Sequence, residues 1–470
     1  MDGGGGISAR LVLSLLAVAA IVILMGVFLR RAPKDDAETA EDRAANRMTA
    51  TATGNRSSSK ARESSLRSHR DGDTGQTAQE IVANKVIQFS KHRRELVHAM
   101  AKHHKANVPD EVERFFEAVE SGNWEAIDAA HKALLQDEKQ LNQPKSAELH
   151  EIWRPIQEAW GAAHEAHNWP AQRLLDYGNG ILESLRPGMI YAGGTDPGCF
   201  IATMLNDTTE GEQHIMLTQN ALADGTYLKY LDFQYHDRMT TLTGDDSQQA
   251  FQNYLTDAQK RLQHDLQFPD EPKQLKPGED VKMSDGGAVQ VSGQVAVMSI
   301  NEKLFQMLMD KNPNVSFAME ESFPFSSMYG SAAPLGPVME MRVQDEQNGL
   351  TAERAAQSVD YWRAQAQQLL SDPEAPEGSD ARKAYSKLVS SQGGLFADNR
   401  LNAQAEEAFR IAAEICPNSP EAVYRYTNLL LAQNRAADAM PVVEAALKAE
   451  PDNKQFQSLL QQVKNIKPGK

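Results

Sequence analysis

Apolar positions recur every three or four residues over most of the chain, a pattern that predicts a largely helical protein. Between residues 82 and 100 this apolar stripe is interrupted only by Arg93. Further helices are expected at about 109–120, 124–135, 146–166 and 169–184. We therefore expect residues 77–184 to form a helical domain of antiparallel helix pairs.

From residue 185 to residue 345 the pattern changes to short apolar runs bounded by Gly and Pro. Strands are expected at residues 189–192, 214–218, 289–298, 315–319 and 338–343. Helices expected at about 199–205, 225–235, 247–267 and 299–311 are long enough to connect parallel strands. This alternation predicts an α/β domain with a mostly parallel or mixed sheet covered by helices.

The C-terminal part of the chain repeats itself after 34 residues. Val389, Gly393, Phe396, Ala405, Phe409, Ala412 and Pro417 recur as Val423, Thr427, Leu430, Ala439, Val443, Ala446 and Pro451. Small and large residues in this order, closed by a proline, resemble the tetratricopeptide repeat. We expect a connecting helix within 346–378 and repeats with a capping helix at 379–470. The resemblance implies a groove that binds a protein partner, although two repeats could instead brace the α/β domain.

Near the N-terminus, residues 11–29 form a run of 19 residues without a charge. This length predicts a transmembrane helix, so we expect a short tail at 1–9, a membrane anchor at 10–30 and a disordered linker at 31–76. A cleaved signal peptide is the alternative, but the run is longer than usual and no cleavage site follows it.

The charges around this run give conflicting signals on orientation. Arg10 precedes the run and Arg30, Arg31 and Lys34 follow it, which favours a cytoplasmic body. A short tail, a single span and a large body are more typical of an exported arrangement. We therefore expect a single-pass protein of the inner (plasma) membrane with an extracytoplasmic body. The complete fold class is mixed α and β: a transmembrane helix, a helical domain, a central α/β sheet domain and a tetratricopeptide α-solenoid.

Charge excludes one class of partner. The chain has a formal net charge of −16, and residues 186–345 hold 22 acidic against 11 basic side chains. Such a surface repels phosphate backbones, so we expect no nucleic-acid partner. Cys199 and Cys416 match no paired metal or redox spacing.

The loop after the first expected strand is the best candidate for a ligand site. Ligands of such sheets bind beyond the carboxyl ends of the strands, which singles out Gly193, Gly194, Thr195 and Asp196. The loop matches neither the P-loop nor the dinucleotide fingerprint, so no cofactor is expected and a structural turn is the favoured interpretation. No catalytic constellation is recognised, which favours a protein that is not an enzyme.

Histidines are dense in the N-terminal helices, and two of them prompt a metal hypothesis. His164 and His167 fall three residues apart on one helical face beside Glu165. Because no HExxH motif is present, we favour solvated or capping histidines and expect no metal site.

A second resemblance concerns residues 185–345. The segments that carry it are the 193–198 loop, Leu217-Thr218-Gln219-Asn220, Tyr227-Leu228, Glu321-Ser322-Phe323-Pro324, Tyr329 and residues 334–339. They resemble the soluble region of large bacterial glycosyltransferase-like membrane proteins. In that family the transferase chemistry belongs to the multi-spanning part, so the resemblance implies a relative of the accessory soluble module, and no catalytic residues are carried over from it.

Two functional hypotheses follow. The first is a membrane-anchored, non-catalytic interaction or scaffold protein of the bacterial cell envelope. A protein partner would bind the repeats, and residues 11–29 would anchor the chain in the membrane. The alternative is an accessory module or enzyme that binds a sugar or nucleotide-sugar at the 193–198 loop.

Overall fold

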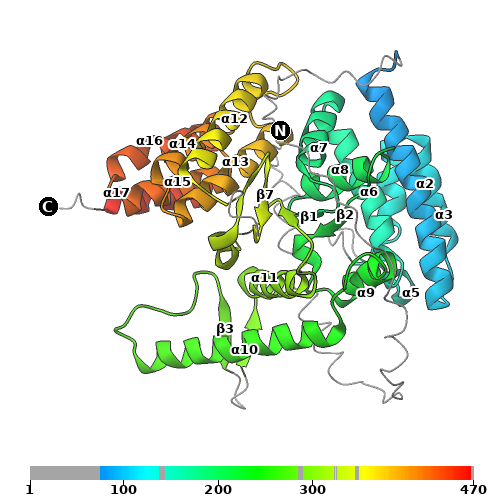
Figure 1. Cartoon of the computed structure of the whole chain (residues 1–470), viewed down its shortest axis with the longest axis horizontal. Coiled ribbons are helices and arrows are strands. Elements are labelled where there is room, and N and C mark those ends of the chain that lie inside the picture. Colours follow the sequence, from blue (N-terminus) through cyan, green and yellow to red (C-terminus); the bar gives the residue numbers. More distant parts are fainter. Residues whose placement is uncertain are drawn as a thin grey trace, which may run out of the picture.

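The computed structural model describes residues 75–136, 143–283, 289–321, 323, 325–343 and 349–466. The N-terminal helices, numbered as in Figure 1, are α2 (Ala78–His104), α3 (Asp110–Ser121), α4 (Trp124–Lys132), α5 (Ala147–His150), α6 (Trp153–Asn168) and α7 (Ala171–Ser184). Helix α2 begins at Thr77, whose hydroxyl accepts from the Glu80 amide while the Glu80 carboxylate accepts from the Thr77 amide. This reciprocal capping satisfies two amides that a helix start otherwise leaves unpaired.

The central part of the chain alternates short strands and helices. Its strands are β1 (Ile190–Gly193), β2 (Ile215–Thr218), β3 (Asp280–Met283), β4 (Val289–Ser292), β5 (Phe317–Met319), β6 (Ala333–Leu335) and β7 (Val338–Met341). Its helices are α8 (Asp196–Asp207), η1 (Gln219–Ala221), α9 (Gly225–Tyr235), α10 (Gly244–Gln267), α11 (Gln294–Lys311) and η2 (Ser326–Ser331).

Five of these strands form a mixed sheet in the order β2-β1-β5-β7-β6. Strands β2 and β5 run parallel to β1, with Ile190 opposite Ile215 and Phe317. Strand β7 is antiparallel to both β5 and β6. All four residues of β1 are buried, as expected for a central strand with helices packed on the sheet.

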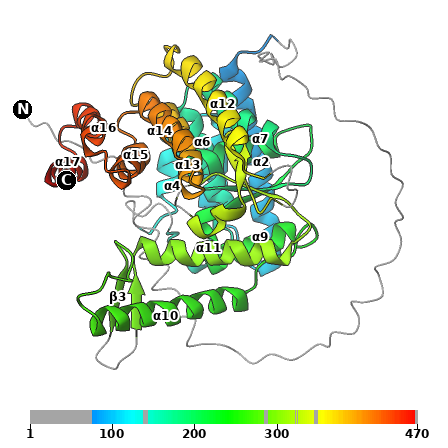
Figure 2. The same ribbon diagram turned by 60° about the vertical axis from the view of Figure 1, so that its left-hand side comes forward.

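A second, smaller unit projects from the body beside α11. Strands β3 and β4 form an antiparallel hairpin that packs on α10, and Figure 2 shows α10 running along α11. Glu279, just before β3, ties the unit together because its carboxylate accepts from Tyr254 Oη and from the Arg261 guanidinium, both on α10. Burial raises the pKa of Glu279, but Arg261, Tyr254 and the Lys276 amide outweigh it and lower the pKa to about 2.

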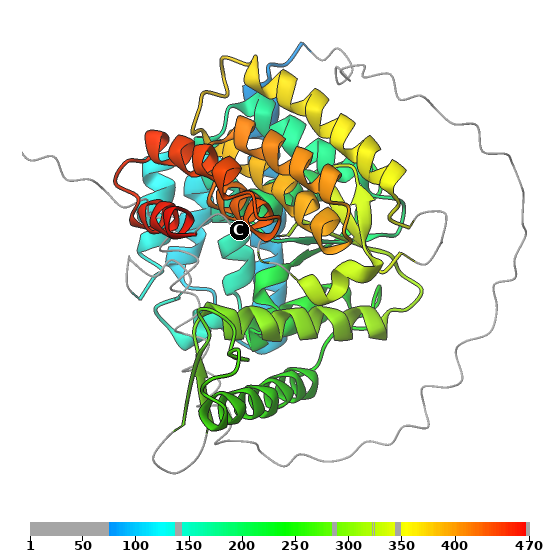
Figure 3. The same ribbon diagram turned by 90° about the vertical axis from the view of Figure 1, so that its left-hand side faces the viewer.

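The C-terminal helices are α12 (Ala352–Leu370), α13 (Asp380–Asp398), α14 (Asn402–Ile415), α15 (Pro420–Ala432), α16 (Ala436–Ala449) and α17 (Lys454–Asn465). Figure 3 faces them, coloured from yellow to red, and shows them stacked side by side. One apolar core runs from α2 through the sheet to α15, and a separate core joins α15, α16 and α17. The first of these helices therefore share their core with the sheet, whereas the last two extend beyond it.

The expected fold class needs correction. The structure is a mainly helical protein with a small mixed sheet, and no helix of the described part is long and apolar enough to cross a membrane. The predicted anchor at 10–30 and nearly all of the predicted linker at 31–76 lie outside the described residues.

The strand expected at 289–298 is also wrong in its second half. Strand β4 ends at Ser292, and helix α11 starts after Gly293, whose φ of 89° ends the extended conformation. A short apolar run does not distinguish a strand from a buried helix start. Strands β3 and β6 are not predicted from the sequence, because they are only four and three residues long and β6 contains Pro334.

Candidate functional site

The loop after β1 donates hydrogen bonds to a carboxylate of the same chain. The amides of Gly194 and Thr195 donate to Glu320 Oε2 at 2.9 and 3.0 Å, and Thr195 Oγ1 donates to Glu320 Oε1 at 2.5 Å. Tyr177 on α7 adds a fourth donor at 2.9 Å. Glu320 directly follows β5, so the parallel pairing of β1 with β5 brings its side chain to this loop.

This arrangement places an internal anion where a helix start would otherwise bind an external one. Glu320 is 1% exposed, and a Cβ added to Gly198 would lie 1.5 Å from its Oε2 atom. Burial, and then the Glu320 charge, raise the pKa of Tyr177 well above its ordinary value, so Tyr177 stays a donor. Of the predicted site residues, Gly194 and Thr195 use their amides for Glu320, Gly193 is buried in β1 and Asp196 is exposed.

The next residue, Glu321, turns toward the C-terminal helices. Its carboxylate pairs with Arg425 on α15, and the same guanidinium donates to the Ser390 carbonyl oxygen at 3.1 Å. Ser391 Oγ donates to the Glu321 carbonyl oxygen at 3.3 Å. Burial raises the pKa of Glu321 and Arg425 opposes the shift, with a raised pKa as the net result. Two adjacent carboxylates therefore connect the sheet to a loop on one side and to the repeats on the other.

The 34-residue repeat places equivalent side chains in rows along α13, α15 and α17. The equivalent positions are Lys387, Ser390 and Gly394 in α13, Glu421, Tyr424 and Asn428 in α15, and Gln455, Ser458 and Gln462 in α17. The α13 row is covered by the chain: Lys387 pairs with Glu421 at 2.9 Å, and a Cβ on Gly394 would meet the Arg425 guanidinium and the Tyr329 ring. The α17 row is exposed.

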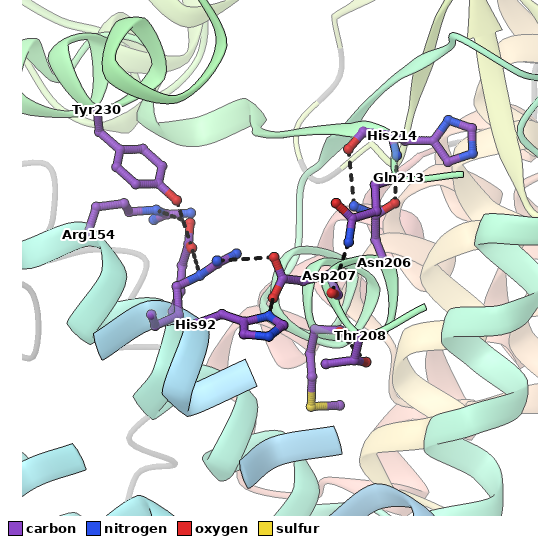
Figure 4. Close-up of polar contacts among 11 residues, drawn as sticks. His92, Arg154, Asn206, Asp207, Thr208, Gln213, His214 and Tyr230 are labelled. Atoms are coloured by element: carbon purple, nitrogen blue, oxygen red, sulfur yellow. Dashed lines mark hydrogen bonds and ion pairs between the residues drawn. The ribbon is translucent and has the colours of Figure 1, made fainter. Parts of the chain in front are cut away.

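A buried charge network joins α2, α6, α8 and α9 (Figure 4). Glu158 accepts from Arg154 at 3.0 Å and from Tyr230 at 2.9 Å, and it pairs with Arg93 at 2.8 Å. Asp207 bonds His92 at 2.7 Å and Arg93 at 3.3 Å. Burial lowers the pKa of Arg93, but the charge of Glu158 and then of its other neighbours outweighs burial and raises the pKa.

Two cavities of about 130 and 270 Å³ adjoin this network near the start of β2. They share Gln213, His214 and Arg238. No motif in the sequence marks these residues, because they come from separate elements and are brought together only by the fold.

The histidines of the N-terminal helices take part in ring stacking. Rings of α4 and α6 alternate in the order Trp153, His131, Trp160, His164, Trp124 and His167, with neighbouring centroids 4.6–5.6 Å apart. Among the described residues there is no group of three or more metal-ligating side chains. The ring stack accounts for His131, His164 and His167, whereas His92 and His98 pair with Asp207 and Glu113.

Comparison with known proteins identifies one region. Residues 397–463 match the tetratricopeptide repeat family, and this match covers α14 to α17. No curated protein and no solved structure gives a significant match, and the resemblance to glycosyltransferase-like proteins is not shown. The C-terminal part of this chain is thus a tetratricopeptide repeat region.

Proposed function

We propose that this protein is a non-catalytic interaction or scaffold protein whose partner binds the open end of its repeat array. The observation that carries the proposal is the repeat match at 397–463, together with the separate core that α15, α16 and α17 form. Repeats of this kind generally mediate protein–protein interaction.

The repeats could brace the α/β domain or bind a partner, and we assign these two roles to opposite ends of the array. At the α13 end, Arg425 and Lys387 are paired with Glu321 and Glu421, and Asn399 donates to the Tyr329 carbonyl oxygen at 3.2 Å. The contacts of Arg425 and Asn399 brace the segment after β5, and the Lys387–Glu421 pair helps to cover the α13 row.

The other end offers a surface of different chemistry. Asn428 on α15 and Gln455, Ser458 and Gln462 on α17 are exposed. Amide and hydroxyl side chains both donate and accept hydrogen bonds, so this surface suits an extended, uncharged segment whose backbone supplies the complementary groups.

Site-specific photocrosslinking tests the proposal. A photoreactive phenylalanine analogue at Ser458 should give a discrete crosslinked partner, and the same analogue at Glu444, exposed on α16, serves as the matched control. Replacing Asn428 and Gln462 by Arg should abolish the Ser458 crosslink without changing the melting temperature. Equal crosslinking from both positions, or none from either, would contradict the proposal.

Ligand binding at residues 193–196 remains the second candidate. It is favoured only by the position of the loop at the carboxyl ends of the parallel strands, and a ligand would have to displace Glu320. If the loop binds a sugar or nucleotide-sugar, Glu320→Gln should strengthen binding of an anionic sugar nucleotide, because the competing charge is removed.

The proposal also places the protein at the bacterial cell envelope with its body outside the cytoplasm. The support is the order of a short N-terminal tail, one uncharged run at residues 11–29 and a large body, which is typical of an exported arrangement; the flanking charges favour the opposite orientation. Protease treatment of intact spheroplasts should remove a tag placed after Lys470. A tag that survives until the cells are lysed would contradict this location.

A further inference from the structure

The two cavities beside the charge network differ in chemistry. The smaller one, about 130 Å³, is lined by polar side chains that include Arg93, Asn206, Gln234 and Arg238. The larger one, about 270 Å³, is lined mainly by apolar residues at the amino-terminal ends of β1, β2 and β5, namely Met189, Ile190, Ile215 and Val315. Both are smaller than the ≈ 300–1,000 Å³ typical of drug-sized ligands, so together they suit a metabolite of amino-acid size.

Two groups at the polar cavity are available to a ligand: a buried acceptor on Gln234 and the solvent-exposed guanidinium of Arg238. Gln234 Oε1 is buried and has no hydrogen-bond partner in the described residues. Arg238 donates to the Gln213 carbonyl oxygen at 2.8 Å and lies 5.9 Å from the Tyr235 ring centroid, yet no carboxylate of the described chain pairs with it. A buried acceptor without a donor costs free energy, and a guanidinium matches a carboxylate in geometry.

Three further polar residues around the cavities, Asn206, Asp207 and His214, are engaged within the chain. Asn206 exchanges two hydrogen bonds with the backbone of His214, at 2.8 and 3.1 Å. His214 Nδ1 lies 3.1 Å from the Met189 carbonyl oxygen and therefore carries its proton there. Asp207 uses one oxygen for His92 and the other for Arg93. The groups that a ligand can engage are thus the unpaired Gln234 acceptor and the Arg238 guanidinium.

Glu212, which adjoins Gln213 in the sequence, is engaged by the backbone. Its Oε1 atom accepts from the Gly188 amide at 2.7 Å. This bond fixes the Glu212 side chain at the Gly188 turn.

We propose that these cavities form a binding site for an apolar α-amino acid. The ammonium group donates to Gln234 Oε1, the carboxylate pairs with Arg238, and the side chain fills the space between Met189, Ile215 and Val315. A zwitterion engages both groups at once, whereas a simple carboxylic acid or a simple amine engages only one.

Isothermal titration of the full-length chain with L-leucine tests this site. The matched probes each lack one group of leucine: glycine lacks the apolar side chain, 4-methylpentanoate lacks the ammonium group and 3-methylbutylamine lacks the carboxylate. We expect leucine to bind at least about tenfold more tightly than each of these, because each probe loses one of three interactions.

Variants separate the site from a general effect. Arg238→Gln and Gln234→Leu should each weaken leucine binding by about tenfold or more, while Arg114→Gln, an exposed arginine on α3, should leave it unchanged. Unchanged melting temperatures show that the variants fold. The proposal is overturned if leucine, valine and phenylalanine all fail to bind, or if Arg238→Gln binds leucine like the unaltered chain. Neither result bears on the repeats, which lie elsewhere in the fold.

Discussion

His131 provides the sharpest test of the packing of the N-terminal helices. Its ring is fully buried between Trp153 and Trp160, and neither ring nitrogen has a hydrogen-bond partner in the described residues. Burial lowers the pKa of His131 from 6.5 to about 3, Asp128 opposes this shift, and Lys132 and His164 add to it. The ring is therefore neutral in the folded protein.

The sign and size of the effect follow from proton linkage. The unfolded chain takes up this proton near pH 6.5 and the folded chain only near pH 3, so stability is complete above pH 6.5 and is lost as the pH falls below it. Each pH unit in this window costs about 1.4 kcal/mol, which amounts to about 2 kcal/mol at about pH 5.

Replacing His131 by Phe should remove this loss, because the ring stays in the stack and no longer takes up a proton. Urea unfolding followed by tryptophan fluorescence is a suitable assay, since four of the five tryptophans lie between residues 124 and 169. The variant should gain about 2 kcal/mol over the unaltered chain on going from about pH 7.5 to about pH 5.

His236→Gln is the matched control, because His236 is exposed at the end of α9 and outside the stack. It should follow the unaltered chain at both pH values. If His131→Phe loses as much unfolding free energy at low pH as the unaltered chain, His131 does not cause that loss. The argument from its burial then fails.

Two further predictions concern the contacts around the end of β5. Arg425→Met leaves the Glu321 carboxylate buried without its cation, which should cost about 3 kcal/mol of stability, and adding Glu321→Leu should recover most of the loss in thermal unfolding. Gly198→Ala should cost about 2 kcal/mol, because its Cβ would overlap Glu320; Gly180→Ala, which meets no atom within 4 Å on α7, should be neutral or stabilising in the same assay.

The sequence predicted the repeats well because their signal is local. The equivalent positions Phe396, Phe409, Leu430 and Val443 are all buried, and the family match confirms the repeat. Gly393 shows why a small residue is needed there, since a Cβ on it would lie 2.7 Å from the Phe409 ring. Periodicity within one or two helices is enough to detect such packing.

The contacts of the candidate sites could not be predicted in the same way. Glu320 lies 126 residues from Gly194, and Arg425 lies 104 residues from Glu321. Both contacts depend on which strands pair and which helix lies over them, and no local pattern carries that information. The sequence marked Gly194 and Thr195 as candidate ligand-binding residues in a favoured structural turn, and in the structure their amides donate to a carboxylate of the same chain.

The covered row on α13 has a practical consequence for anyone who isolates the repeats. A fragment that starts at residue 379 would lack the segment around Glu321 and Tyr329 and would leave the Arg425 guanidinium without its carboxylate. Such a fragment would display a cationic surface that the intact protein keeps internal. Acidic peptides that bind such a fragment would bind a surface that only the truncation exposes. Screens for binding partners should therefore use the intact chain.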